Sequence, residues 1–128
     1  MKALKYSDIS LIPEFGQASS RSDCDTSTEI GGKRYNLPVI PANMKSVVSE
    51  KYCEWMAIND YFYIMHRFDI DIFEFILKAN DLKWPLISIS VGVKDEDRAL
   101  IEKIAEWGVP KVDFITVDIA HGYSQRMQ

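Results

Sequence analysis

Four apolar runs, separated by stretches with helical periodicity, constrain the fold more than any other feature of this sequence. The runs cover residues 37–43, 61–66, 86–93 and 112–120. Apolar residues recur at helical spacing after each of the first three runs, over 46–58, 69–81 and 95–107. Such a β/α series predicts a parallel sheet with right-handed crossovers. A doubly wound sheet and a (β/α)8 barrel both fit this pattern.

Local signals indicate where these elements begin and end. Ser46 is a candidate N-cap of the first helix, and Asp69 or Asp71 of the second. Gly108 is expected to end the third helix. Residues 1–36 read as an irregular leader with a short hairpin around Gly31-Gly32, and residues 37–128 as an incomplete α/β domain.

Composition excludes several classes of function. A net charge of −4 and a pI near 5.1 argue against nucleic acid as a partner, because a phosphate polymer requires a clustered basic surface. No apolar window approaches the length that spans a bilayer, so neither a membrane anchor nor a signal peptide is expected. Cys24 and Cys53 lack the spacing of a metal site or a disulfide framework, which favours reduced thiols in a cytoplasmic protein without a bound metal.

Polar residues follow every apolar run. Because the carboxyl ends of parallel strands lie at one end of a barrel, the polar residues should converge there, and this favours the barrel. The residues concerned are Asn43, Met44 and Lys45 after the first run, His66 and Arg67 after the second, Ser90 and Gly92 in the third, and Asp118, His121 and Gly122 after the fourth.

Three of these residues carry the strongest candidate chemistry. Asp118 could bridge the hydroxyls of a ribose, or it could be a helix cap or a structural ion pair. Arg67 could bind a phosphate or a cofactor, with a surface charge beside Asp69 as the alternative. His121 could be a general base, although a histidine in a turn is more often a structural hydrogen-bond partner.

Weaker candidates lie elsewhere in the chain. Asn43 and Met44 could contact a planar ring, but the pattern alone favours Met44 as a core residue. Ser20 and Arg21 could bind a phosphate, but residues of these types in an irregular leader are more often solvated. The segment 90–93 has a single glycine, which excludes a Rossmann or P-loop phosphate site.

Six segments together resemble one family. They are YSDISLIP at 6–13, SRSDCDT at 20–26, LPVIPANMKSVVSE at 37–50, YFYIMHRFD at 61–69, SISVGV at 88–93 and VDIAHGYS at 117–124. In this order they resemble the inosine monophosphate dehydrogenase and guanosine monophosphate reductase superfamily of (β/α)8 barrels. The chain would then cover the leader and roughly the first four β/α units.

The resemblance also separates the two branches of the superfamily. Its dehydrogenases usually carry a pair of CBS modules between the second helix and the third strand, where this chain has only residues 69–85. The chain therefore looks like the reductase branch. A dehydrogenase lacking CBS modules remains an alternative, as does a non-catalytic half-barrel that binds or assembles by pairing with itself.

The resemblance to the reductase branch implies an activity and a set of sites. It implies NADPH-dependent reductive deamination of GMP to IMP and ammonia in a cytoplasmic homotetramer. A family cysteine attacks purine C2 to form a thioimidate, and hydride then arrives from the nicotinamide. That cysteine and the associated K+ site would lie beyond Gln128, so no catalytic residue is expected in this chain, which alone should be inactive.

The remaining family roles fall on residues of this chain. By resemblance, Ser20 and Arg21 touch NADPH bound to a neighbouring subunit, and Asn43 and Met44 lie beside the purine. The cofactor-binding residues would be Arg67, Asp118, Ile119 and Ala120. Several reductases have lysine at position 67, and arginine stays protonated, which argues against a proton-transfer role for Arg67.

Overall fold

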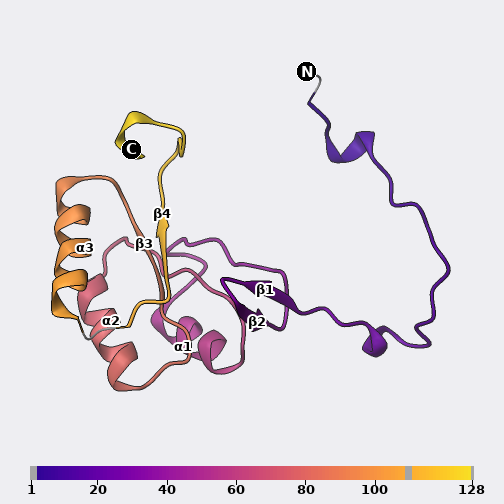
Figure 1. Cartoon of the computed structure of the whole chain (residues 1–128), viewed down its shortest axis with the longest axis horizontal. Coiled ribbons are helices and arrows are strands. Elements are labelled where there is room, and N and C mark those ends of the chain that lie inside the picture. The colour runs from indigo at the N-terminus through magenta and orange to yellow at the C-terminus, as the bar shows by residue number, and fades with distance from the viewer. Residues whose placement is uncertain (1–2, 109–110, 128) are drawn as a thin grey trace.

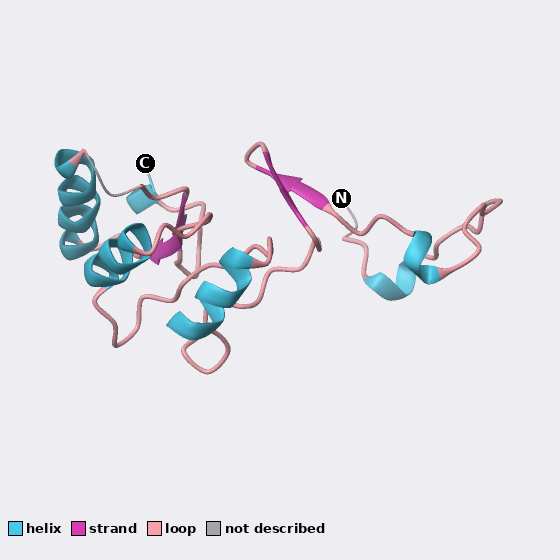
Figure 2. Cartoon of the chain, turned by 90° about the horizontal axis from the view of Figure 1, so that it is seen from below, coloured by secondary structure: helices cyan, strands magenta, loops and turns pink. Residues whose placement is uncertain are grey.

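A parallel pair of strands flanked by helices forms the body of the protein, and an N-terminal leader runs away from it (Figure 1 and Figure 2). The computed structural model describes residues 3–108 and 111–127. Residues 3–26 are exposed throughout and contain two short 3-10 helices, η1 (Tyr6–Asp8) and η2 (Arg21–Asp23). Among the described residues, no helix has the length and apolar character needed to cross a membrane.

The hairpin expected around Gly31-Gly32 is confirmed. Strand β1 (Thr28–Ile30) pairs antiparallel with β2 (Lys33–Tyr35). Both glycines have positive φ, 59° and 78°, which a tight two-residue hairpin turn requires. The sequence signal is local, so it could be read without knowledge of the rest of the fold.

The parallel strands and the last two helices also agree with the sequence. Strand β3 (Ser88–Val91) pairs in parallel with β4 (Phe114–Val117). Helix α2 (Ile72–Asp81) begins after Asp71, whose carboxylate accepts hydrogen bonds from the amides of Phe73 and Glu74. Helix α3 (Asp95–Trp107) ends at Gly108, which has a left-handed conformation. The short 3-10 helix η3 (Gln125–Met127) follows β4.

Two expectations were wrong. The first helix, α1 (Glu50–Ile58), begins after Ser49, whose hydroxyl accepts from the amide of Tyr52, and not after Ser46. The runs 37–43 and 61–66 are not regular strands, since only Met65 forms a single parallel bridge, to Ile89. A strand needs the backbone of a neighbour on its ladder, and in the described part of the chain the run 37–43 has none.

The core lies where the bridge at Met65, strand β3 and helix α2 meet. Its largest fully buried side chains include Tyr63, Met65, Phe75, Ile76 and Ile89. The Tyr63 hydroxyl donates to the Leu86 carbonyl oxygen at 2.8 Å, which pairs the buried phenol with the backbone. The third helix lies against the second, because Lys103 Nζ is 3.5 Å from the centroid of the Phe73 ring.

An aromatic cluster and a buried carboxylate join the hairpin to the body. The rings of Tyr35, Phe62 and Phe114 meet edge to face, with centroids 5.2 and 5.0 Å apart. Asp113 lies just before β4 and pairs with both Lys33 of the hairpin and Lys111. The position of the hairpin is therefore fixed by packing and charge together.

Candidate functional site

The carboxyl ends of the paired segments bring the second and fourth polar clusters together. Met65 bridges Ile89, and β4 lies on the other side of β3, so residues that follow Met65 and Val117 emerge at the same end of the sheet. The Asp118 amide donates to the Val91 carbonyl oxygen at 2.8 Å, which continues the ladder by one residue. The backbone segments that carry Arg67 and Asp118 are therefore held in a fixed register by β3.

Arg67 and Asp118 make the central contact of this site. Arg67 Nε lies 3.7 Å from Asp118 Oδ2, and Arg67 Nη2 donates to the Asp118 carbonyl oxygen at 3.3 Å. Their side chains are 28% and 33% exposed, so the pair is sheltered but reachable from solvent. Arg67 thus lies against Asp118 and is not an exposed surface charge, and the contact fits both the ligand-binding interpretation of Asp118 and the alternative of a structural ion pair.

Two buried side-chain donors of the polar clusters have no hydrogen-bond partner among the described residues. Arg67 Nε is buried and has no hydrogen-bond partner among the described residues, and the same holds for Asn43 Nδ2. A buried donor without a partner costs free energy, so such groups commonly receive a ligand or water. A cavity of about 480 Å³ borders Arg67, Ser90 and Asp97.

Other predicted polar residues support the backbone. His66 is buried, and its Nδ1 accepts from the Phe68 amide at 3.2 Å. The Ser90 hydroxyl donates to the Met65 carbonyl oxygen at 2.8 Å, and the Gly92 amide donates to Asp97 at 2.7 Å. These contacts occupy the side chains of His66 and Ser90 and shape the loops around Arg67.

Met44 and Lys45 of the first polar cluster lie at the surface, whereas Asn43 is half-buried. Met44 is 54% exposed, so its interpretation as a core residue was wrong. Lys45 forms an ion pair of 2.7 Å with Asp69, whose pKa is lowered by the hydrogen bond and the charge of Lys45. The sequence alone did not predict this link, because the two residues lie 24 positions apart and no periodic pattern connects them.

Several predicted residues are not brought to Arg67. Ser20 and Arg21 lie in the leader, where the Ser20 hydroxyl contacts Ser22 and caps η2. Ile119 is half-buried, whereas Ala120, His121 and Gly122 are exposed. Within the described residues, no hydrogen bond joins His121 to another group, so no neighbouring side chain orients its imidazole as a general base.

The two thiols differ in environment. Burial raises the pKa of Cys53 to about 12, which keeps this thiol protonated and inert. Cys24 is exposed in the leader. Within residues 3–108 and 111–127 there is no group of three or more metal-ligating side chains.

Comparison with known proteins identifies related enzymes. No model of a protein family matches the chain. The chain is 52% identical over 128 residues to a protein named GMP reductase from Staphylococcus carnosus and 45% identical over 128 residues to one from Acidovorax ebreus. The matches cover 99% and 100% of this chain but only 39% of each relative. The chain thus spans well under half the length of the curated relatives it matches.

A solved structure has the same fold. The crystal structure of inosine 5' monophosphate dehydrogenase from Legionella pneumophila superimposes with a TM-score of 0.72 at 27% identity. The match covers 98% of this chain and 38% of that chain, and includes the parallel β/α segments that carry Arg67 and Asp118. Along its whole length the chain is therefore similar to proteins of the IMP dehydrogenase and GMP reductase superfamily, and it has the fold of part of a (β/α)8 barrel.

Proposed function

We propose that this chain is the N-terminal part of an enzyme that converts GMP to IMP and ammonia with NADPH, a reaction of purine nucleotide interconversion. The observation that carries the proposal is 52% identity over 99% of the chain to a GMP reductase. The match spans 99% of the chain, so it includes the loops as well as the buried strands. Loops at the carboxyl ends of barrel strands carry specificity, so similarity there bears on function.

The pair formed by Arg67 and Asp118 supports a cofactor role. NADPH, when bound, would supply hydride to the purine. In the proposed site, the guanidinium of Arg67 holds oxygen atoms of the cofactor, and Asp118 fixes the guanidinium through the contact of 3.7 Å. Ile119 and Ala120 follow directly and would line the same site. Arg67 orients but does not move protons, because its guanidinium remains charged at neutral pH.

The free amide donor of Asn43 supports a purine role for the first cluster. Asn43 Nδ2 is buried without a partner in the described part of the chain, which fits a donor reserved for an acceptor on the base. Met44 is exposed beside it and offers a polarizable sulfur to a planar ring. A cavity of about 540 Å³ borders Met44, Lys45 and Phe68, which leaves space for such a ring.

The leader fits a role in another subunit. Ser20 and Arg21 are exposed and lie in a segment that runs away from the body, so in the proposed homotetramer they would contact NADPH bound to a neighbour (Figure 1). The nucleophilic cysteine and a K+ site belong, in this proposal, to the part of the enzyme outside this chain. A cytoplasmic location accompanies the proposed substrate.

An IMP dehydrogenase without CBS modules is the second candidate. The likeness to the Legionella pneumophila structure favours it, since that protein is named as a dehydrogenase. The identity of 27% is lower than the 52% shared with a GMP reductase, which places the reductase first. A non-catalytic half-barrel module that pairs with itself is the third candidate, and sedimentation of the isolated chain as a discrete dimer that binds NADPH would favour it.

One experiment distinguishes the enzymatic candidates. The 128-residue chain is joined genetically to the remainder of the Staphylococcus carnosus GMP reductase, and the purified product is assayed with GMP plus NADPH and with IMP plus NAD. We expect GMP-dependent NADPH oxidation and no turnover by the 128-residue chain alone. Faster reduction of NAD with IMP would favour the dehydrogenase, and turnover by the isolated chain would contradict the proposal.

A further inference from the structure

The two partners of the Arg67–Asp118 pair are anchored to the sheet differently. On the Asp118 side, β4 pairs with β3 over four residue pairs, and the Asp118 amide adds a hydrogen bond to the Val91 carbonyl oxygen. On the Arg67 side, the backbone of the run 61–66 is hydrogen-bonded to β3 only at Met65 among the described residues. The position of Arg67 therefore depends on a few contacts near Met65.

Ser90 supplies one of these contacts with its side chain. Two backbone hydrogen bonds make the bridge, from the Met65 amide to the Ser88 carbonyl oxygen at 3.0 Å and from the Ser90 amide to the Met65 carbonyl oxygen at 2.9 Å. The Ser90 hydroxyl donates to the same Met65 oxygen at 2.8 Å, so it uses the second lone pair of that carbonyl. Ser90 is 0% exposed, so bulk water cannot take the place of the hydroxyl.

His66 holds the turn on the other side of Arg67. Its Nδ1 accepts from the Phe68 amide at 3.2 Å, and His66 is buried. The guanidinium carbon of Arg67 lies 4.8 Å from the centroid of the Phe68 ring, so the arginine packs against a ring whose backbone His66 holds. Arg67 thus lies between two contacts of side chains with backbone, one made by Ser90 before it and one made by His66 after it.

The contact between Arg67 and Asp118 leaves little room for displacement. Arg67 Nε lies 3.7 Å from Asp118 Oδ2, and Arg67 Nη2 donates to the Asp118 carbonyl oxygen at 3.3 Å. Both distances exceed the roughly 2.9 Å of a typical N–H···O hydrogen bond. Added freedom of the backbone near Met65 would separate the two groups further, because the pair has no shorter bond to hold it.

We propose that Ser90 is a positioning residue of the cofactor site, which acts through the Met65 carbonyl oxygen to hold Arg67 against Asp118. The inference rests on the proposed function, because Arg67 is taken to hold oxygen atoms of NADPH. Ser90 need not touch the cofactor, since its one hydroxyl proton is donated to Met65. Loss of the hydroxyl should weaken cofactor binding and leave GMP binding nearly unchanged, because the proposed purine contacts lie on the segment 43–44.

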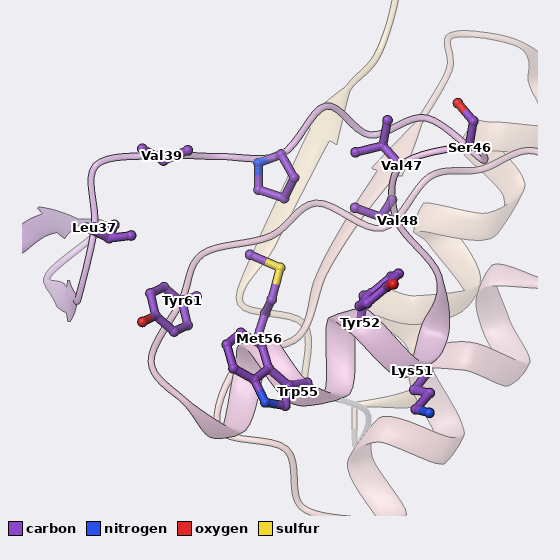
Figure 3. A pocket seen from close by; sticks show the side chains of 11 residues that line it. Leu37, Val39, Ser46, Val47, Val48, Lys51, Tyr52, Trp55, Met56 and Tyr61 are labelled. Atoms are coloured by element: carbon purple, nitrogen blue, oxygen red, sulfur yellow. The ribbon is translucent and has the colours of Figure 1, made fainter.

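Ser90 and Arg67 border the same cavity, of about 480 Å³. A larger, apolar cavity of about 880 Å³ lies between the run 37–41 and α1, where Tyr52 and Trp55 form part of the wall (Figure 3). Neither Ser90 nor Arg67 lines that larger cavity. A change at Ser90 should therefore act on the site of Arg67, and the smaller cavity leaves space for a methyl group added at Ser90.

The test uses the enzyme completed with the Staphylococcus carnosus remainder, assayed with varied NADPH and varied GMP. Ser90→Ala should raise KM for NADPH about fivefold, as expected for loss of one buried hydrogen bond, and change KM for GMP by less than about twofold. Ser90→Thr keeps the hydroxyl and should restore KM for NADPH to within about twofold of wild type. Titration with NADPH in the absence of GMP should give the same order of dissociation constants.

Ser88→Ala is the matched control. Ser88 lies two positions earlier on β3 and is also fully buried, but its hydroxyl has no hydrogen-bond partner in the described part of the chain. Its removal should change KM for NADPH by less than about twofold. Hydrogen exchange of the Phe68 amide should be faster in Ser90→Ala and unchanged in Ser88→Ala and Ser90→Thr. Circular dichroism should show all variants folded.

A double-mutant cycle with Asp118→Asn shows whether Ser90 acts through the pair. If it does, Ser90→Ala should raise KM for NADPH by less than about twofold once Asp118→Asn has already weakened the contact. Fully multiplicative effects of the two substitutions would overturn the proposal. So would equal changes in Ser90→Ala and Ser88→Ala, or a failure of Ser90→Thr to restore cofactor binding.

The choice of cofactor separates this inference from the proposed function. Turnover of GMP with NADPH, with an unaltered KM for NADPH in Ser90→Ala, would support the reductase and overturn the role of Ser90. Turnover of IMP with NAD, with a rise of about fivefold in KM for NAD in Ser90→Ala, would do the reverse. A completed protein that binds neither nucleotide would contradict both.

Discussion

Arg67 and Asp118 come from different β/α units, and their contact is the smallest feature that depends on the whole sheet. The side chains meet only because Met65 and Val117 leave the sheet at the same end. Lys45 and Asp69 form a second ion pair between the loops after the first two runs, but there the side chains are 62% and 77% exposed. Exposed pairs of this kind contribute little free energy, so the two contacts should behave differently when broken.

Replacing Asp118 tests the role of the sheltered pair. In the enzyme completed with the Staphylococcus carnosus remainder, Asp118→Asn should lower kcat/KM for NADPH by about tenfold, equivalent to about 1.4 kcal/mol. The loss should appear mainly in KM, because the residue is proposed to orient the cofactor. Asp69→Asn, the control on the exposed pair, should change kcat/KM by less than about twofold. Similar losses in both variants would argue against a specific role for Asp118.

Asp113 is a buried carboxylate with a structural role. Its side chain is 7% exposed, it pairs with Lys33 and Lys111, and it accepts from the Ile87 amide at 2.8 Å. Asp113→Asn should lower the free energy of unfolding by about 2 kcal/mol, as for loss of a charged hydrogen-bond partner. The control is Asp25→Asn, which breaks the exposed pair with Arg34 and should leave the urea midpoint nearly unchanged. Urea unfolding measures both.

The same carboxylate should make stability depend on pH. Burial alone would raise the pKa of Asp113, but hydrogen bonds from Lys33, the Ile87 amide and Lys111 outweigh it and lower the pKa below 3.8. Because the folded value lies below the unfolded value, the stabilisation is fully present above pH 3.8 and is lost as pH falls through the folded pKa. The difference in the free energy of unfolding between wild type and Asp113→Asn should therefore become smaller as the pH is lowered into the acid range. A constant difference would contradict this linkage.

At the scale of elements, helix α2 depends on a single capping side chain. Asp71 accepts from the amides of Phe73 at 2.9 Å and Glu74 at 3.1 Å. Asp71→Ala should destabilise the protein by about 1 kcal/mol, whereas Asp71→Asn should be nearly neutral because asparagine is an equally good N-cap. Thermal unfolding of the three proteins measures this order. Equal destabilisation by alanine and asparagine would show that charge, and not capping, dominates.

The two hairpin glycines offer a matched pair. A Cβ at Gly31 would lie 2.6 Å from the Phe114 ring, whereas at Gly32 it would meet nothing within 4 Å. Both have positive φ, so each alanine variant should lose about 1 kcal/mol from backbone strain. Gly31→Ala should lose about 1 kcal/mol more, because the ring must shift. If denaturant unfolding gave equal losses of free energy of unfolding for the two alanine variants, the Phe114 ring would be able to move without an energetic cost.

Elements with local signals could be predicted, and those that need a partner could not. Asp71, Gly108 and the paired glycines of the hairpin mark their elements within a few residues, and the structure confirms all three. The runs 37–43 and 61–66 are apolar enough for strands, but pairing of the first requires a backbone that the described residues do not supply. Ser46 and Ser49 are both plausible caps, and only the turn at 45–47 selects Ser49.

In the candidate site too, some contacts could be predicted from the sequence and others could not. Arg67 and Asp118 could be brought together by reasoning from parallel strand ends, since register fixes where each residue emerges. The partners of Asp69 and Asp113 could not, because Lys45 and Lys33 reach them across 24 and 80 residues of sequence. Such pairings depend on loop conformation, for which the chain offers no periodic signal.

At the scale of the whole molecule, the protection of backbone amides against hydrogen exchange should decline from the centre of the sheet to its edges. β3 is hydrogen-bonded on both sides, by the Met65 bridge and by β4, and all four of its residues are buried. β4 is paired on one side only, and residues 37–43 have no ladder among the described residues.

Hydrogen exchange of the isolated chain should reproduce this order. The amide of Ser90, which donates to the Met65 carbonyl oxygen at 2.9 Å inside the core, should exchange slowest, at a rate set by global unfolding. Amides of β4 that face its open edge should exchange faster, and those of 37–43 nearly as fast as in an unfolded chain. Equal protection of 37–43 and β3 in the isolated chain would mean that the run is already paired, for example with a second copy, and the rest of a barrel would then have no free edge to occupy.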